Sequence, residues 1–528
     1  MVSRLKLVFG RFSPISIALR ASPVLLFTYS DSRDSQTRGK EFPPSALAAS
    51  ADLRFPPSPD FISLKPPFDM PQNQAPGRPG NLTPEQEQKL KDLWTIVMRT
   101  FGVSPPPTLL ESSTITSTIS TTSVNGSAEP TSEIVNGDVS TNGEKSKKKR
   151  FGILKRKDKD KDKDKKDKDR EKSKESNVSN LTRTGSTLSS PTVGADDDND
   201  KYGQSKQFKE ALAEMTPEEL RVAFWSMVKA DHPDGLLLRF LRARKWDVKK
   251  AHVMMVSTMH WRLKEMDVEA IVFKGEGAAL AEHDEGFLKQ IRLGKSYLHA
   301  RDKLGRPICT VRARLHKQGD QTDEAMNRYT VYVMETARMC LKDPVDTATV
   351  IFDLSQFSLA NMDYAPVKFM VKCFEAHYPE SLGICVVYKA PWIFQGVWNI
   401  IKGWLDPVVA SKIHFAKTVD DIAQFVDRDV LWKELGGDVD WEYKFLEPVP
   451  GEDDLLKDTE TREKLLEERA KIVREYEDAT WTWIYSTSSE ARKARHEIAK
   501  RLREDYVGLD PYLRARTVYD RMNYIQLN

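Results

Sequence analysis

The distribution of hydrophobic and polar residues divides the chain after residue 206 into short apolar runs and longer amphipathic stretches. Apolar runs that end in turn residues are typical of strands buried in a sheet, whereas apolar residues repeating every three or four positions predict helices. The predicted strands are 307–315, 348–354, 384–388 and 412–416, and the predicted helices between them are 322–340 and 359–377. This alternation predicts an α/β domain over residues 284–445, with a mixed, largely parallel sheet covered by helices.

The stretch from Leu382 to Ile413 has an unusual pattern. After its strand comes a segment that holds three of the chain's eleven tryptophans, namely Trp392, Trp398 and Trp404. As a helix, this segment is apolar around most of its circumference and has one thin polar stripe of Gln395, Asn399 and Lys402. It is shorter than the roughly 20 residues that span a bilayer. Two interpretations stay open: a buried core helix, or a wall between an internal cavity and a membrane.

Capping signals predict helices before this domain. Residues 82–102 form one amphipathic helix, in which Thr83 and Gln86 make a capping box. Residues 207–270 form a helical module, in which a second capping box begins at Thr216 and Asp234 is expected to cap the next helix.

Charged helices are expected again after the α/β domain. The segments 461–477 and 489–506 belong to a helical C-terminal extension, 455–528. These helices could pack on the rest of the chain or bind a partner such as a lipid kinase or another protein.

Two segments do not have the composition of a folded core. Residues 103–206 are rich in Ser and Thr and then in alternating Lys and Asp, which favours disorder. Their basic run 147–157 could contact anionic lipid, act as a nuclear-localisation-like patch, or simply be solvated. Residues 1–81 are expected to be a disordered extension. Residues 1–30 resemble a mitochondrial transit peptide, whereas residues 1–69 as a whole could instead be a dispensable extension or the product of a mis-chosen start upstream of Met70.

Global composition narrows the classes of function. The formal net charge is only +3, so it does not indicate a nucleic-acid partner. Four cysteines in 528 residues do not form a disulfide framework, and none lies in a Cys-x-x-Cys pair. No uninterrupted apolar run reaches the roughly 18 residues that mark a membrane span, so we expect no transmembrane helix. We expect a cytoplasmic monomer that associates peripherally with membranes, with the mitochondrion as the alternative location.

Sequence signatures of catalysis are missing. The chain has no Gly-x-Ser-x-Gly elbow and no GxxxxGK[ST] phosphate loop. Cys373 and His377 are spaced as half a metal site, but no second pair accompanies them. Asp353 is interpreted as a turn residue. We therefore expect no catalytic residues, no metal and no cofactor.

Several short motifs together identify a family. The segment LLRFLRARK, residues 237–245, is followed in order by Gly-Arg-Pro at 305–307, Tyr-Pro-Glu at 378–380, Leu-Asp-Pro at 405–407 and Gly-Gly at 436–437. This ordered set, over about residues 207–445, resembles the CRAL-TRIO lipid-transfer proteins, and in particular their phosphatidylinositol transfer branch. The resemblance implies a sheet that floors an apolar lipid cavity, with a mobile helix as its gate.

The resemblance also implies site residues. In the phosphatidylinositol-binding branch the headgroup is held at positions that correspond here to Arg244, Lys245, Glu380 and Lys412. The implied gate helix contributes eight apolar residues: Trp392, Ile393, Phe394, Val397, Trp398, Ile401, Trp404 and Leu405.

The sequence departs from the family pattern at a threonine headgroup contact, which is Val409 here, at a glycine that is Gln356, and at Cys309-Thr310 in a strand that lines the cavity. These departures put phosphatidylcholine binding in doubt and leave room for another second ligand, such as a sterol.

The sequence thus predicts a non-vesicular phospholipid transfer protein, and phosphatidylinositol is the expected ligand. A lipid-dependent regulatory scaffold and a sterol-binding member of the same fold are the alternatives. Its partners would be membrane lipids and transiently contacted membrane surfaces.

Overall fold

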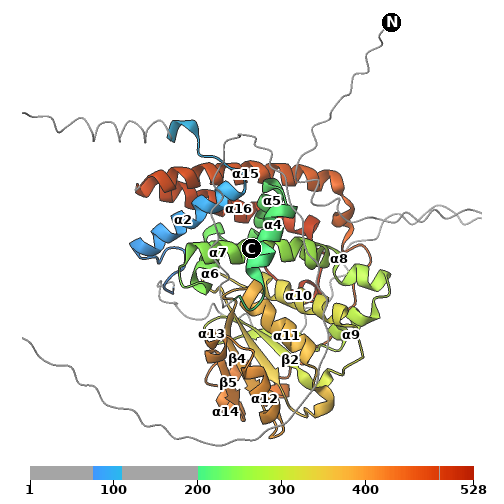
Figure 1. Ribbon diagram of the computed structural model, residues 1–528. Coiled ribbons are helices and arrows are strands. Elements are labelled where there is room, and N and C mark those ends of the chain that lie inside the picture. The colour runs from blue at the N-terminus through green and yellow to red at the C-terminus, as the bar shows by residue number, and fades with distance from the viewer. Residues whose placement is uncertain (1–74, 110–199, 487, 528) are drawn as a thin grey trace, which may run out of the picture. The chain divides into compact units, whose positions relative to one another are not determined.

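A five-stranded sheet organises residues 296–416. The computed structural model describes residues 75–109, 200–486 and 488–527 (Figure 1). The strands are β1 (Ser296–Arg301), β2 (Pro307–Arg312), β3 (Ala348–Asp353), β4 (Leu382–Tyr388) and β5 (Ile413–Ala416), in that spatial order. Strands β1 and β2 pair antiparallel and all later neighbours pair parallel. The prediction of a mixed, largely parallel sheet is therefore confirmed.

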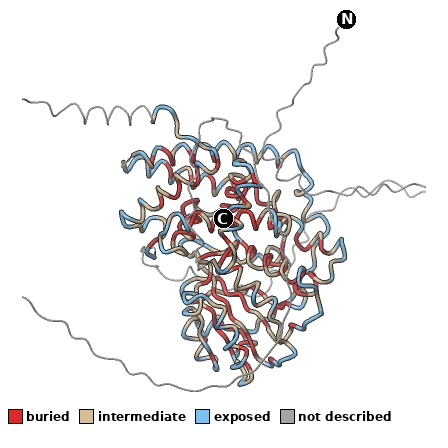
Figure 2. The backbone as a smooth tube through the Cα atoms, viewed as in Figure 1, coloured by how far each residue is buried: buried red, intermediate tan, exposed pale blue. Residues whose placement is uncertain are grey.

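Side chains alternate between the two faces of the sheet, as the pleat requires. On β3, Val350 and Phe352 belong to one apolar cluster, whereas Ile351 belongs to another on the opposite face. On β4, Val387 lies with the first cluster and Tyr388 with the second. Both faces are covered, which explains why these strands read as continuous apolar runs in the sequence (Figure 2).

The predicted helix 322–340 is confirmed as α10 (Asp323–Met339), with Thr322 as its N-cap. The single helix predicted over 359–377 is wrong. The structure has a 3₁₀ turn (Leu359–Asn361), then α11 (Tyr364–Lys372), then a π-helix (Cys373–His377). The break arises because Met362 is extended and the Asp363 side chain caps a new helix by accepting from the Ala365 N–H.

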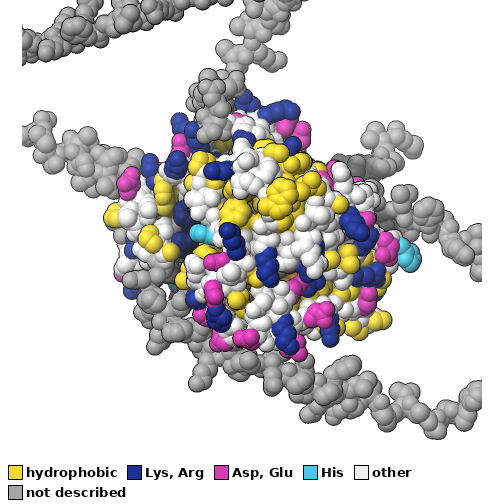
Figure 3. Space-filling view, turned by 90° about the horizontal axis from the view of Figure 1, so that it is seen from below, with side chains coloured by type: hydrophobic (Ala, Val, Ile, Leu, Met, Phe, Trp, Pro, Cys, Tyr) yellow, Lys and Arg dark blue, Asp and Glu magenta, His cyan; other side chains and the backbone are white. Residues whose placement is uncertain are grey.

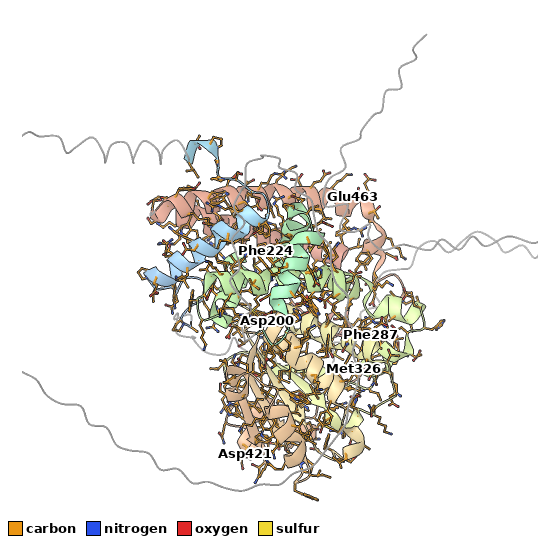
Figure 4. All side chains as sticks on the ribbon, in the orientation of Figure 1. Asp200, Phe224, Phe287, Met326, Asp421 and Glu463 are labelled. Carbon is orange, nitrogen blue, oxygen red and sulfur yellow. The ribbon has the colours of Figure 1, made fainter. Side chains whose placement is uncertain are left out.

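The helical module contains α4 (Gln204–Glu214), α5 (Pro217–Val228), α6 (Pro233–Ala243) and α7 (Val248–His260). Helix α2 (Pro84–Thr100) packs on α6 and α7. The capping boxes at Thr83 and Thr216 form as predicted. Figure 4 labels Phe224 of α5 in this region, and its ring contacts Trp94 of α2 at a centroid distance of 5.6 Å.

The elements that were not predicted include α8 (Val268–Ala281), α9 (Glu285–Arg292) and β1. Helix α8 contains a kink at Gly275, whose φ of 53° lies in the left-handed region, and this kink disturbs the helical repeat. A Cβ at Gly275 would lie 2.5 Å from the Cβ of Ala515, so the close approach of the C-terminal segment also requires glycine there. Strand β1 is short and its burial does not alternate along the sequence, so no strand pattern marks it.

The prediction that Asp234 caps α6 is wrong. His232 is the N-cap, and its Nδ1 accepts a hydrogen bond from the backbone N–H of Asp234. The Asp234 carboxylate is instead buried, where it accepts from both Nη atoms of Arg495 and from Trp94 Nε1 at 2.7 Å. Although burial alone would raise it, Arg495 holds the pKa of Asp234 below its usual value.

The C-terminal helices pack on the helical module. Helix α15 (Thr459–Tyr485) and helix α16 (Ser489–Leu513) run side by side, and the short α17 (Val518–Arg521) follows (Figure 1). Tyr476 and Leu502 lie in the same buried cluster as Trp94 of α2. Of the two alternatives left open by the sequence, packing on the chain itself is the one observed.

No helix within the described ranges is both long enough and apolar enough to cross a membrane. Helix α4 begins at Gln204, three residues before the start expected for the helical module. The extension up to residue 74 and the linker from 110 to 199, including the basic run 147–157, lie outside the described residues.

The buried ion pair yields a stability prediction. Asp234→Asn removes the counter-charge of Arg495, a side chain that is only 4% exposed, and should lower the free energy of unfolding by about 3–5 kcal/mol. Urea denaturation measures the loss. Asp478→Asn, at an exposed position of α15, is the matched control and should change stability by well under about 1 kcal/mol. Equal effects of the two substitutions would contradict the role given to the ion pair.

Candidate functional site

The tryptophan-rich stretch forms a β–α–β unit. Helix α12 (Phe394–Lys402) and the short α13 (Pro407–Ser411) connect β4 to β5, which lie side by side and parallel. Parallel neighbours need such a crossover, and here the crossover covers one face of the sheet. Asp406 caps α13 by accepting from the Val408 N–H at 2.8 Å. This cap sets where α13 begins and separates it from α12.

An apolar cavity lies between this crossover and the sheet. Its free volume is about 240 Å³, far above the roughly 15 Å³ that holds one water. Its floor is formed by alternate residues of the three central strands, Cys309, Val311, Val350, Phe352, Cys385 and Val387. Its walls come from α10 and α11 and include Met326, Val333, Val367, Met370 and Val371. An apolar enclosed space of this kind holds hydrocarbon rather than water.

Helix α12 closes this cavity with one face. Phe394, Trp398 and Ile401 line the cavity, and Leu405 and Val409 continue the wall toward β5. Val397 is buried in the same apolar cluster, which also contains Val387 of the sheet floor. Val409 therefore lies on the cavity wall, where the family pattern has a threonine.

The other face of α12 is mixed rather than apolar. Gln395, Asn399 and Lys402, the polar stripe seen in the sequence, are exposed there. Trp392, which is 89% exposed, and Ile400, at 47%, are the apolar side chains turned to solvent. Trp404 does not line the main cavity: its ring packs edge-on against Tyr364 at 5.4 Å. Ile393 is half-buried.

The exposed apolar side chains of this crossover continue onto neighbouring elements. Val408 of α13 and Phe415 of β5 are each 48% exposed, and Trp398 contacts the Phe415 ring at 5.1 Å. Figure 3 views the molecule from below the orientation of Figure 1, the end where α12 and α14 (Val419–Ile422) are drawn, and shows hydrophobic side chains gathered among charged side chains of both signs. An exposed apolar surface of this kind is suited to a membrane interface.

Polar groups collect at one end of the cavity. Lys295, which is 5% exposed, places its Nζ 3.2 Å from His316 Nδ1 and 3.3 Å from Gln321 Oε1. His316 Nε2 lies 3.2 Å from the Asp363 carboxylate. Burial lowers the pKa of Lys295 to about 8. Sequence reasoning missed this end, because its residues lie on three separate segments with no shared motif.

The expected headgroup residues fall into one close pair and two separate positions. Lys412 Nζ lies 3.7 Å from the Glu380 carboxylate, and both side chains are about one quarter exposed. Arg244 is half-buried and donates to Gln204 Oε1, while the Gln204 amide donates to the Ala376 carbonyl. Arg244 is thereby joined through Gln204 to the π-helix that precedes Glu380.

Lys245 is exposed and has a φ of 50°. None of the expected headgroup residues lines the apolar cavity itself.

Glu375 connects Lys201 and Tyr202 to the α12–α13 crossover. Its carboxylate accepts from Lys201 Nζ, from the Tyr202 hydroxyl and from the backbone N–H of Asp406, each at 2.7 Å. Lys201 also donates to the Trp404 carbonyl. Burial and the hydrogen bond to Glu375 raise the pKa of Tyr202. One half-buried carboxylate therefore ties the N-terminus of α13 to the π-helix.

The residues considered for a metal serve other purposes. Cys373 is fully buried, and the His377 ring stacks on Trp261 with centroids 4.0 Å apart. Burial lowers the pKa of His377. Over the ranges that the structure describes, no three His, Cys, Asp or Glu side chains are grouped so that they could hold a metal ion. Asp353 pairs with Arg314 and accepts from the Ser355 N–H, as a turn residue does.

Comparison with known proteins agrees with this architecture. The family model of the CRAL/TRIO domain matches residues 291–437, and that of the CRAL/TRIO N-terminal domain matches residues 204–257. A CRAL-TRIO domain-containing protein of Schizosaccharomyces pombe is 42% identical over 85% of this chain and 92% of its own length. The phosphatidylinositol transfer protein CSR1 of Eremothecium gossypii is 40% identical over 85% of this chain and 98% of its own.

Among solved structures, the crystal structure of Sfh5 covers 49% of this chain and 94% of its own chain, with 16% identity and a TM-score of 0.34. That likeness is too weak to bear on the site.

The Glu375 contacts predict how firmly the crossover is held. Glu375→Gln removes the charge that strengthens three hydrogen bonds. The amides of residues 394–411 should then exchange with deuterium about tenfold faster, since a hydrogen bond to a charged group contributes about 1.5–3 kcal/mol. Hydrogen–deuterium exchange with mass spectrometry measures this. Glu324→Gln, at an exposed position in the first turn of α10, is the control. Exchange by Glu375→Gln as slow as in that control would contradict the role given to Glu375 in holding the crossover.

Proposed function

The chain belongs to the CRAL-TRIO family, a family of lipid-binding and lipid-transfer proteins, and from that premise we propose that it extracts phosphatidylinositol from membranes and carries it in the cavity beneath α12. The observation that supports this most strongly is the apolar cavity, closed on one side by a short crossover helix. The 40% identity to a relative named as a phosphatidylinositol transfer protein supports the choice of lipid. The reaction is transfer, so no covalent step is required.

The energetics of extraction explain why such a cavity is needed. A phospholipid that leaves a bilayer exposes about 30 methylenes at about 0.8 kcal/mol each, which gives a penalty above roughly 20 kcal/mol. Only a closed apolar enclosure offsets a penalty of this size. The lining of α12 supplies one wall of the enclosure, so the helix must move for lipid to enter, as lids do at other enclosed sites.

The proposed headgroup site uses the Glu380–Lys412 pair together with Arg244 and Lys245. A phosphodiester would bind the ammonium and guanidinium groups, and the Glu380 carboxylate would accept hydrogen bonds from inositol hydroxyls. The 3.7 Å separation of Glu380 and Lys412 is looser than a tight ion pair, so a ligand can insert its own polar groups between them. Glu380 and Lys412 lie just before the first residues of β4 and β5, at the same edge of the sheet.

The proposed membrane contact uses the exposed apolar side chains on and beside α12. Removal from water at a membrane interface stabilises Trp392 by about 1.5–3 kcal/mol, and the half-exposed Ile400 and Val408 by about half as much each. That gain offsets the loss of the contacts that Phe394 and Val397 make in the closed state. Membrane association of this kind is peripheral and transient, and we propose the cytoplasm as the location.

The headgroup assignment predicts a loss of ligand. The double substitution Arg244→Ala and Lys412→Ala should reduce the phosphatidylinositol that co-purifies with the protein about tenfold or more, because two charged hydrogen-bonding groups are lost. Lipid mass spectrometry measures the loading. Lys417→Ala, an exposed lysine next to β5, is the control. Normal loading in the double variant would remove these two residues from the site.

The proposed membrane contact predicts variants that transfer lipid more slowly but remain folded. Replacing Trp392 and Ile400 with aspartate should slow phosphatidylinositol transfer between vesicles about tenfold or more, because the interfacial contact is lost while exposed positions tolerate charge. Thermal denaturation checks the fold. Gln395→Asp, on the exposed polar stripe, is the matched control and should transfer normally. Unimpaired transfer by the double variant would contradict the membrane contact.

A further inference from the structure

A second, polar cavity lies outside the proposed lipid site. It has a free volume of about 210 Å³ and is walled by the turn at 75–81, by α6, by the segment 341–346, by α16 and by the C-terminal residues. Arg78, His496 and Arg503 belong to its lining and lie outside the ranges matched by the family models. Its chemistry is therefore built partly from segments outside the two family-model ranges.

The cavity contains more positive than negative charge. Arg78 and Arg242 both bind the Asp346 carboxylate, at 2.9 and 3.0 Å, and Arg239 donates to the Asp346 backbone carbonyl. Two guanidiniums thus share one carboxylate and the third donates to backbone carbonyls, so the three arginines and Asp346 together carry two formal positive charges. The further lining cations Lys229, Arg338 and Arg503 pair with Glu335, Asp231 and Asp343 respectively, so we do not count them toward this excess.

Arg242 has a donor, and Arg239 a charge, that the protein does not satisfy. Arg242 Nε is buried and makes no hydrogen bond. Arg239 has no carboxylate within ion-pair distance among the described residues, and it donates instead to the carbonyls of Glu380 and Asp346. Burial, together with repulsion from Arg78 and Arg239, lowers the pKa of Arg242 to about 10. A buried group of cations with too few counter-charges is stabilised by a bound anion.

The local packing holds the arginines in place. Arg242 Nη1 donates to the Gly77 carbonyl at 2.8 Å, so the turn that carries Arg78 is fixed to α6. A Cβ at Gly77 would lie 3.1 Å from the Trp246 ring, and Gly77 has a φ of 76°, so this turn approaches α6 as closely as only glycine allows. The cluster is preorganised, and guanidinium groups suit the geometry of phosphate oxygens.

We propose that this cavity binds an anion bearing a phosphate group, held by Arg78, Arg239 and Arg242, at a site distinct from the lipid cavity. Arg239 Nη1 also donates to the Glu380 carbonyl at 2.8 Å, so the anion would lie next to the turn that carries a proposed headgroup residue. The site is independent of the proposed lipid transfer: it shares no lining residue with α12.

The test is isothermal titration calorimetry of the full chain with inorganic phosphate, at constant ionic strength set with chloride. The expected result is saturable binding of one phosphate per chain. Arg78→Gln should weaken it about tenfold or more, since one charge-assisted hydrogen-bond donor is lost. Asp346→Asn should strengthen it, because the competing carboxylate charge disappears. Arg501→Gln, an exposed arginine of α16 paired with Glu475, is the control and should bind as the natural chain does.

A merely structural cluster would respond differently. In that case Arg78→Gln and Asp346→Asn would both lower the melting temperature and leave phosphate binding absent or unchanged, and this outcome would overturn the proposal. If only Asp346→Asn fails to fold, the Arg78→Gln titration still decides. Vesicles of phosphatidylcholine with and without phosphatidic acid form a second arm. Binding there that depends on Arg78, without binding of free phosphate, would assign the phosphate to a lipid headgroup.

Absence of Arg78-dependent binding in both arms would reject the site. Vesicle-to-vesicle lipid transfer by Arg78→Gln, measured without phosphate, should be normal. A failure of this proposal therefore leaves the proposed transfer function untouched.

Discussion

The contact between α12 and the apolar face of the sheet is the constraint on which the proposed function depends. Phe394 and Val397 are buried against the strands that form the cavity floor. In the closed state these apolar side chains are therefore shielded from water. Opening it exposes this surface, so opening requires another apolar environment. The exposed Trp392 and Ile400 lie on the same crossover and suit a membrane interface, and in the proposed mechanism this couples the opening of the cavity to the membrane.

The rest of the chain gives this crossover a fixed frame. The helical module, α2 and the two long C-terminal helices share one buried cluster, and the Asp234–Arg495 ion pair lies within it. Helix α7 contacts the π-helix that carries Glu375, and Glu375 in turn binds the start of α13. The apolar surface of the C-terminal helices is used inside the chain, which leaves mainly their charged faces for any partner.

Much of the fold could be predicted from the sequence because its local signals agree. The strands β3 and β4 are buried on both faces, and Thr83, Thr216 and Thr322 are N-caps. The errors have physical reasons. Asp234 has the residue type of a cap, but a distant arginine binds its carboxylate, and no local pattern reveals a partner so far away in sequence. The 359–377 segment keeps helical composition across the break at Met362 and Asp363.

The candidate site was predictable only where one stretch of sequence contains it. Residues 382–413 supply part of the floor, the gate and Lys412, so their hydrophobic pattern alone indicates a helix with apolar residues on two sides. The pattern overestimates how apolar the solvent-facing side of α12 is. Trp398 and Ile401 face the cavity, and the sequence does not reveal that orientation. The polar end at Lys295 and the arginine cluster around Asp346 are assembled from segments far apart in sequence, and residue spacing carries no signal for such sites.

The most direct measurement is mass spectrometry of the lipids bound to the full chain purified from its own cells. The account predicts phosphatidylinositol as the main bound lipid, at close to one molecule per chain, and its depletion when Val387 at the cavity floor is replaced by the bulkier Trp. A protein that carries no lipid, or one whose main ligand lacks both acyl chains and a phosphodiester, would contradict it.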